Sequence, residues 1–335
     1  MLTAWIIVLI ASLYILVKAA DYFTDYAEKM GKILKLPNFI VGVLIVAIGT
    51  SLPELATSIA GVSSGEVEFL SGNVLGTIIA NILFGVALTV IIVNKPLKLN
   101  WDIVSNDLPF FAAAIFLTAI ALLDGKFTFI EALLFLAGYV IYVFYAYYIQ
   151  KSERASIKEK YEKQLKRKIK TEIADIEKRD KKLKGKKALI KITIYLIISL
   201  IVVAIASNYV IESVINIATI LGLGTSVIAA TVVAIGTSLP EIFVAIVAAK
   251  KGNFDMAIGD ILGSSIFDLF IIYGTVGLFT TLTITHEFFV ILISFLIASF
   301  VLLWMALIDK QITRSEGWIF IIIYLMFIGK LFNIF

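Results

Sequence analysis

Residues 46–54 read Val-Ala-Ile-Gly-Thr-Ser-Leu-Pro-Glu, and the same nine residues return without change at positions 233–241, 187 residues later. At the same offset, Gly72–Asn81 (GNVLGTIIAN) aligns with Gly259–Asp268 (GDILGSSIFD). Nine consecutive identities at a constant offset indicate an internal duplication that spans large parts of the chain. We therefore expect a fold built from two related halves.

The composition is typical of a membrane protein. Of the 335 residues, 60% are hydrophobic and only 16% are charged, and the mean hydropathy is +1.00. Soluble domains carry roughly 25% charged residues. The apolar side chains therefore exceed what a core of this size could bury, and the solvent for the excess must be lipid.

The residue types available for chemistry are mostly oxygen ligands. Cysteine is absent and His286 is the single histidine, which excludes a thiolate site and a histidine cluster for zinc. Carboxylates, hydroxyls, amides and carbonyls suit calcium, magnesium, sodium or potassium. No paired nucleophile and base is evident, and the repeated motif is not a nucleophile elbow. We expect neither an enzyme nor a cofactor.

A helix needs about 20 mainly apolar residues to cross a bilayer. The sequence predicts an all-α polytopic protein with ten transmembrane helices. These lie near residues 2–24, 38–62, 68–93, 107–123, 127–149, 189–208, 225–249, 256–280, 286–308 and 316–334.

The duplication divides these helices into two groups of five. Residues 1–150 form the first five-helix repeat, 151–187 a basic loop, and 188–335 the second repeat. An odd number of spans forces the second repeat to enter the membrane upside down, so the repeats are expected to be inverted about an axis in the membrane plane. Inverted halves around a central site suit alternating access.

Basic residues predict the orientation. Residues 151–187 hold sixteen basic and seven acidic residues, and every other connection after an odd-numbered span also carries Lys or Arg. Because such residues stay on the cytoplasmic side, we predict a multi-pass cell-membrane protein with both termini extracellular and the 151–187 loop cytoplasmic. Attraction of that loop to anionic lipid is a second interpretation.

Two glutamates lie midway along apolar spans. An ionised carboxylate there costs about 2.5–3.5 kcal/mol, so Glu54 and Glu241 need partners. Pro53 and Pro240 precede them and free a backbone carbonyl one turn earlier. The sequence predicts a broken or kinked helix at each site, whose carbonyls, hydroxyls and carboxylates form an oxygen cage. Packing of a kinked helix is the alternative reading of the Pro, Ser and Thr residues.

The second repeated segment adds polar residues at a spacing of four, which places them on one helix face. Thr77 pairs with Asn81 in this way, and Ser264 pairs with Asp268. Asp268 contributes a third buried carboxylate, which leaves room for an additional cation or a proton. Asn73 and Asp260 lie further along each helix, and we expect them outside the ion's immediate contacts or in a vestibule. The glycines Gly72, Gly76, Gly259 and Gly263 are expected to allow close helix packing.

The duplicated Gly-Thr-Ser-Leu-Pro-Glu, followed by Gly-Asn-x-x-Gly-Thr or Gly-Asp-x-x-Gly-Ser, resembles the α-repeats of the sodium/calcium exchanger family, within the calcium/cation antiporters. The likeness covers nearly the whole chain except 151–187 and is greatest to the prokaryotic ten-helix members. It implies that sodium and calcium are the transported ions, exchanged by alternating access. Helices one and six would slide across the other eight as the gate.

The resemblance also implies a ligand set. Calcium would bind between Glu54 and Glu241 with the carbonyls of Thr50 and Thr237. For sodium the implied ligands are the hydroxyls of Ser51, Ser238, Ser264 and Thr77 and the carbonyls of Ala47 and Ala234, while Asn81 and Asp268 line the middle. One departure concerns Thr77, because the family usually has Ser there, and the extra methyl group could shift ion affinity.

Other functions remain open at this stage. Asp268 matches an acidic position of potassium-dependent relatives, and potassium-independent prokaryotic members carry it too. A proton- or potassium-coupled exchanger of calcium or another divalent cation therefore stays an alternative. Magnesium is disfavoured because it dehydrates reluctantly, and a passive channel is disfavoured by the inverted halves. Besides the two ions and the lipid bilayer, neither a nucleic acid nor a protein partner is evident.

Overall fold

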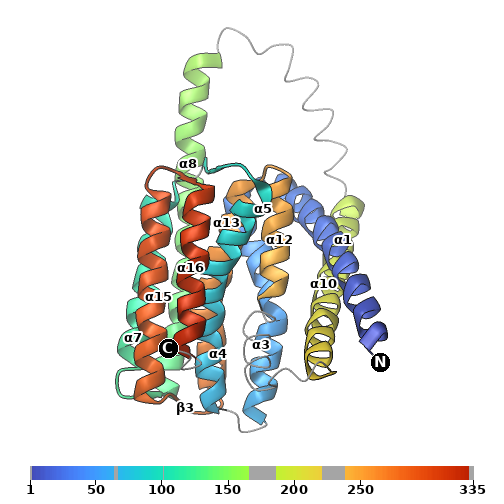
Figure 1. The fold of residues 1–335 in the computed structure, drawn as a ribbon. Helices are drawn as coiled ribbons and strands as arrows, with labels where there is room; N and C mark the ends of the chain where they lie inside the picture. Colours follow the sequence, from blue (N-terminus) through green and yellow to red (C-terminus); the bar gives the residue numbers. More distant parts are fainter. Residues whose placement is uncertain (1, 64–66, 101, 166–185, 221–237, 332–335) are drawn as a thin grey trace.

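A computed structural model describes residues 2–63, 67–100, 102–165, 186–220 and 238–331. These residues form a bundle of helices with short strands in the connections (Figure 1). The helices are α1 (Leu2–Leu34), α2 (Asn38–Val41), α3 (Ala47–Ser63), α4 (Val67–Ala80), α5 (Val86–Val93), α6 (Ile103–Asn106), α7 (Leu108–Ala121), α8 (Phe129–Leu165), α10 (Lys186–Ile220), α12 (Leu239–Lys250), α13 (Phe254–Phe267), α14 (Tyr273–Gly277), α15 (His286–Leu307) and α16 (Arg314–Leu331). Three π-helical turns lie between some of them: η1 (Gly42–Val46), η2 (Asn81–Gly85) and η3 (Asp268–Ile272).

Seven helical segments among the described residues are long and apolar enough to cross a membrane. They coincide with the predicted spans one, two, three, five, six, eight and nine. The other three predicted spans correspond to α7, α12 and α16, which are shorter or carry more charge within the described residues. The helical, polytopic fold is confirmed, and crossing of the membrane by these three helices stays a prediction.

Two short strand pairs have the arrangement that an inverted duplication predicts. Strand β1 (Leu97–Lys98) pairs with β4 (Gln311–Ile312), and β2 (Lys126–Phe127) pairs with β3 (Leu282–Thr283), both antiparallel. Each ladder joins one connection of the first repeat to one of the second. In Figure 1, β3 lies at the lower end of the bundle, whereas the connection between α15 and α16 lies at the upper end. Exchanging the repeats therefore exchanges the ladders and the ends of the molecule, as an inverted duplication requires.

The start of the last helix of each repeat shows the same correspondence. The backbone N–H and hydroxyl of Thr128 donate to Glu131 Oε2 at 2.6 and 2.8 Å before α8. Thr313 donates to Glu316 Oε2 at 2.6 and 2.7 Å before α16. Both are Thr-x-x-Glu caps, which satisfy N–H groups that a helix start leaves free.

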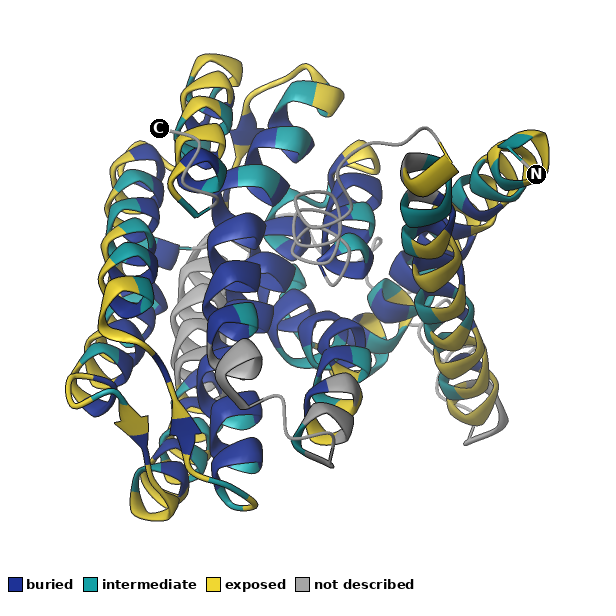
Figure 2. Cartoon of the chain, turned by 60° about the horizontal axis from the view of Figure 1, so that its bottom comes forward, coloured by how far each residue is buried: buried dark blue, intermediate teal, exposed yellow. Residues whose placement is uncertain are grey.

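Burial separates a core from a peripheral helix pair. The span that contains α13 is 94% buried, whereas the span formed by α1 is 17% buried. Helices α1 and α10 pack along each other beside the other helices (Figure 1), and their outer faces are exposed (Figure 2). Because these faces carry mostly Ile, Leu, Val and Tyr, lipid is their natural solvent.

Glycines bring α13 against the helix that precedes the first motif. A Cβ atom at Gly259 would lie 2.5 Å from the carbonyl oxygen of Phe39, and one at Gly263 would lie 2.7 Å from the Cα of Val43. The predicted close packing is confirmed at both glycines. An added Cβ at Gly76 would meet nothing within 4 Å among the described residues. The segment equivalent to the one that Gly263 contacts, residues 230–234, lies outside them, so close packing at Gly76 stays a prediction.

The basic connections meet at one end of the bundle. The Arg314 guanidinium donates to Asn94 Oδ1 at 2.8 Å, which joins the connections after the third and ninth predicted spans. Lys251 forms ion pairs of 2.8 and 2.7 Å with Asp21 and Asp25 of α1. These ion pairs join the peripheral α1 to the connection between α12 and α13. We call the end of the molecule that carries this connection the Lys250–Gly252 end.

Candidate ion-binding site

The repeated motifs meet in the most buried part of the molecule. Residues of the first repeat come from α3, α4 and η2, and residues of the second come from α12, α13 and η3. The predicted site residues that the structure describes are all buried, with exposed fractions of 0–6%. They are Ala47, Thr50, Ser51, Glu54, Thr77, Asn81, Ser238, Glu241, Ser264 and Asp268. The remaining two, Ala234 and Thr237, lie outside the described residues.

Side chains of one repeat contact carboxylates of the other. The Ser51 hydroxyl donates to Glu241 Oε1 at 3.4 Å, so the first motif of one half touches the glutamate of the other. Thr50 Oγ1 lies 3.4 Å from Asp260 Oδ1, and 3.2 Å from the carbonyl oxygens of Val46 and Ala47. A hydroxyl carries one proton and two lone pairs, so Thr50 donates to one of these oxygens at a time.

The backbone around the first motif differs in one respect from the sequence prediction. The helix α3 runs from Ala47 to Ser63 through Pro53 without ending there. The irregular turn is η1, which ends at Val46, the first residue of the motif. Pro53 still has no N–H to donate to the carbonyl of Gly49, so this carbonyl lacks its usual helical partner one turn before the glutamate.

Two further irregular turns begin at predicted ligands. Asn81 is the first residue of η2, and Asp268 is the first residue of η3. A π-turn widens the helix by one residue and is frequent at functional sites. The equivalent position of the two turns shows that the duplication preserves this deviation from α-helix.

Many buried polar atoms at the site make no hydrogen bond within the described part of the chain. They are Asn81 Nδ2 and Oδ1, Ser238 Oγ, Glu241 Oε2, Asp260 Oδ2, Ser264 Oγ, and Asp268 Oδ1 and Oδ2. A buried polar atom without a partner costs about 1–3 kcal/mol, so a fold accepts so many only where another group completes them. Oxygen atoms dominate this set, and cations are the natural partners of oxygen atoms.

The charge of the site also favours a bound cation. Four buried carboxyl groups, from Glu54, Glu241, Asp260 and Asp268, belong to it, while none of the described buried residues is Lys or Arg. The described residues also hold no group of three acidic or histidine side chains close enough to bind a metal ion by themselves. Hydroxyl, amide and carbonyl oxygens must therefore complete any coordination, as the mixed ligand set predicts.

Asp260 lies deeper in the molecule than a vestibule position. The sequence predicts it outside the ion's immediate contacts or in a vestibule. It is fully buried and contacts Thr50 of the opposite repeat, so the vestibule position is wrong, while a place outside the ion's immediate contacts stays a prediction. The available signal was the internal alignment, in which Asp260 carries a carboxylate where Asn73 carries an amide.

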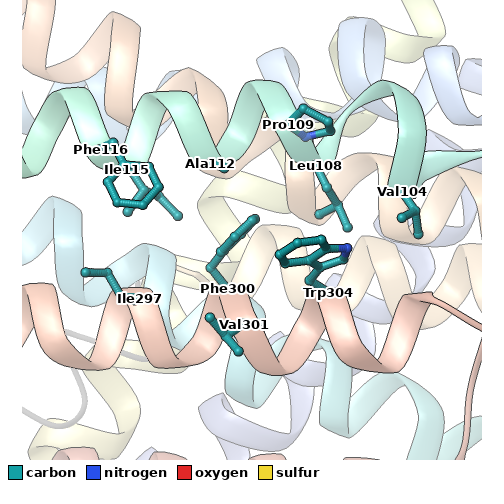
Figure 3. A pocket seen from close by; sticks show the side chains of 10 residues that line it. All are labelled: Val104, Leu108, Pro109, Ala112, Ile115, Phe116, Ile297, Phe300, Val301 and Trp304. Carbon is teal, nitrogen blue, oxygen red and sulfur yellow. The ribbon is translucent and has the colours of Figure 1, made fainter.

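A separate cleft of about 310 Å³ between α7 and α15 carries no such chemistry (Figure 3). Its lining is apolar and consists of Val104, Leu108, Pro109, Ala112, Ile115, Phe116, Ile297, Phe300, Val301 and Trp304. Such a surface suits a lipid chain and lacks ligands for an ion.

Inverted helical repeats around a buried, acidic, oxygen-rich centre define a membrane antiporter for cations. The chain belongs to the sodium/calcium exchanger family, since the family described as sodium/calcium exchanger protein matches residues 4–148 and 191–332. The basic segment 151–187 falls in the gap between the two matches. The family transports sodium and calcium, consists of transporters rather than enzymes, and needs no cofactor.

Individual relatives agree with this assignment. The chain is 31% identical to the sodium/calcium exchanger MaX1 of Methanosarcina acetivorans over the full length of both chains. It is 28% identical to the inner membrane protein YrbG of Escherichia coli, over 81% of this chain and 79% of that protein. The solved structure of the sodium-calcium exchanger NCX_Mj is similar with a TM-score of 0.77 at 25% identity, covering 98% of this chain and 99% of that one. The protein is thus a multi-pass membrane exchanger of cations that include calcium.

Proposed function

We propose that this protein exchanges sodium for calcium by alternating access, with both ions competing for one central site. The observation that carries the proposal is the contact between repeats at the buried carboxylates. Ser51 of the first repeat donates to Glu241 of the second at 3.4 Å. A site shared in this way changes whenever the halves move relative to each other, which is the requirement for coupling ion binding to a conformational change.

In this proposal, the two glutamates hold calcium. One calcium ion balances the charges of Glu54 and Glu241 when both are ionised, with the carbonyls of Thr50 and Thr237 as further ligands. The sodium ligands are the Ser51, Ser238, Ser264 and Thr77 hydroxyls, the Ala47 and Ala234 carbonyls, and the adjacent Asn81 and Asp268. Because the same glutamates serve both ions, sodium and calcium compete rather than bind independently.

The gate consists of α1 and α10. These helices pack on each other, have lipid-type outer faces and are far less buried than α13. A peripheral pair can slide over a fixed core without disturbing its packing, whereas moving α13 would break contacts along its whole surface.

In this proposal the two inverted repeats are residues 1–150 and 188–335.

The Lys250–Gly252 end faces the cytoplasm in this arrangement. It gathers basic connections after odd-numbered spans, and such residues favour the cytoplasmic side. Both termini then lie outside the cell, and the 151–187 loop lies inside.

A proton- or potassium-coupled exchanger is the second candidate. Asp260 and Asp268 favour it, because they add two buried carboxyl groups beyond the two glutamates that balance one calcium ion. A further cation or proton could occupy them without a change of architecture.

Calcium uptake into proteoliposomes separates these functions. Vesicles loaded with sodium and diluted into sodium-free medium should accumulate radioactive calcium, and a sodium ionophore should abolish the accumulation. Uptake driven by a pH gradient in the absence of sodium would favour proton coupling. A requirement for potassium on the calcium side would favour potassium coupling. Calcium flux that needs no counter-ion gradient and never exceeds equilibrium would show a channel and refute exchange.

A further inference from the structure

The two repeats differ in charge at two pairs of equivalent positions: Asn81 and Asp268, where the π-turns begin, and Asn73 and Asp260, earlier in the helices. Asn73 of α4 is half-buried, whereas Asp260 of α13 is fully buried. The glycines on either side are the same in both repeats, Thr77 follows Asn73 by four residues, and Ser264 follows Asp260 by four. At this position, the first repeat therefore has an amide (Asn73) and the second has a carboxylate (Asp260).

The contacts of Asp260 direct it toward the ion site. Its Oδ1 atom lies 3.4 Å from the Thr50 hydroxyl of the other repeat. Its Oδ2 atom is buried and makes no hydrogen bond within the described residues. The charged or hydroxyl-bearing side chains that face it are Glu241, Thr50 and Ser264. None of them is a cation, so its charge lacks a basic partner in the described structure.

Asp260 occupies a definite level along the helix. It precedes Asp268 by eight residues, which corresponds to about 12 Å along an α-helix, and it precedes Ser264 by about 6 Å. Since α13 begins at Phe254, Asp260 lies nearer the Lys250–Gly252 end than Ser264 and Asp268 do. Asn73 is placed equivalently toward the opposite end of the molecule.

We propose that Asp260 is an ion ligand that holds a monovalent cation, with the hydroxyls of Thr50 and Ser264, on the side of the central site nearer the Lys250–Gly252 end. Thr50 can donate its proton to Val46 or Ala47 and turn a lone pair toward the cation. One carboxylate with two hydroxyls matches a single positive charge, whereas calcium takes six to eight oxygens and usually several carboxylates. The side that carries Asn73 lacks such a ligand, so the two access routes differ.

This inference rests on the proposed sodium exchange and is tested with Asp260→Asn, which copies the amide of Asn73. The variant is reconstituted in one orientation, and the sodium concentration for half-maximal calcium exchange is measured with sodium supplied from each side in turn. We expect that concentration to rise about tenfold or more when sodium enters from the Lys250–Gly252 end, as when a charged ligand is lost, and to change less from the other end. An equal shift at both ends, or none at either, would overturn the proposal.

Two variants serve as controls. Asp255→Asn removes the same charge from the first turn of α13, where the half-buried Asp255 accepts hydrogen bonds from Asn100, and should leave both sodium dependences unchanged. Asp260→Glu keeps the charge and should retain the wild-type asymmetry at least in part. If Asp260→Glu folds and shows the same sodium dependence as Asp260→Asn, the charge at this position has no part in ion binding.

A binding measurement distinguishes failure of this inference from failure of the proposed function. The melting temperature of purified protein in detergent is recorded against sodium, with lithium and potassium in parallel. If wild type does not couple sodium to calcium yet sodium raises its melting temperature, and does so more weakly in Asp260→Asn, the proposed function fails and the ligand role stands. Equal stabilisation of wild type and variant by every monovalent cation would refute the ligand role whatever the transport result.

Discussion

Replacing Glu241 by glutamine removes a negative charge from the middle of the molecule while changing its shape very little. The side chain is fully buried, and its Oε1 accepts from the Ser51 hydroxyl at 3.4 Å. Glutamine can keep that acceptor, because its amide oxygen can take the place of Oε1. The opposite atom becomes an NH₂ group, which repels a cation where Oε2 would have bound it.

The expected loss follows from the burial of the charge. Removing one partner of a buried charge pair costs about 3–5 kcal/mol, and each 1.4 kcal/mol corresponds to about tenfold in affinity. Calcium affinity should therefore fall by about 100-fold or more, and calcium transport should be abolished. Folding should not suffer, because a buried charge without a basic partner disfavours membrane insertion by about 2.5–3.5 kcal/mol.

The assay is sodium-driven calcium uptake in proteoliposomes, normalised to the amount of reconstituted protein. Glu54→Gln should behave in the same way, since it supplies the corresponding carboxylate of the other repeat. Glu212→Gln is the matched control, because Glu212 is exposed on α10, and it should transport like wild type. Uptake above about one tenth of wild type (about 1.4 kcal/mol) in Glu241→Gln or Glu54→Gln, with correctly folded protein, would refute the assignment of these carboxylates.

Three further outcomes are expected. Gly263→Ala should lower the free energy of unfolding by about 1–3 kcal/mol because the new methyl group overpacks the helix contact, and melting curves check this. A tag inserted within residues 152–184 should react with an impermeant label only after the cytoplasmic side is exposed, because the basic excess stays there. Asp268→Asn should keep sodium/calcium exchange within about tenfold of wild type, because Asn81 already supplies an amide at the equivalent position, and exchange is measured over a pH and potassium series.

Each of these has a contradicting result. A stability of Gly263→Ala equal to that of wild type would show that the contact between α13 and the first repeat accommodates the added methyl group without cost. Labelling of the tag from outside intact cells would reverse the orientation. Near-complete loss of exchange by folded Asp268→Asn at every pH and potassium concentration would show that its charge is required.

The sequence alone was sufficient for the overall plan of the molecule. A duplicated nine-residue motif, an odd number of predicted spans in each copy and a lipid-like composition predicted inverted helical repeats, and the strand ladders agree with them. Glu54, Glu241 and Asp268 could be selected because an acidic residue in an apolar span is costly without a function. These features depend on chain order and residue type, which a sequence contains completely.

Tertiary structure decided which residues meet. The contact of Thr50 with Asp260 joins positions 210 residues apart, and helical spacing within one segment carries no information about such a distance. The π-turns at Asn81 and Asp268 also have no composition signal, because one extra residue in a turn is stabilised by the packing around it rather than by local propensity. The close approach at Gly259 and Gly263 depends on which neighbour each glycine faces. Side-chain contacts between distant segments arise only when the whole chain is packed, and for this reason the role of Asp260 could be inferred from the structure and not from the spacing of its motif.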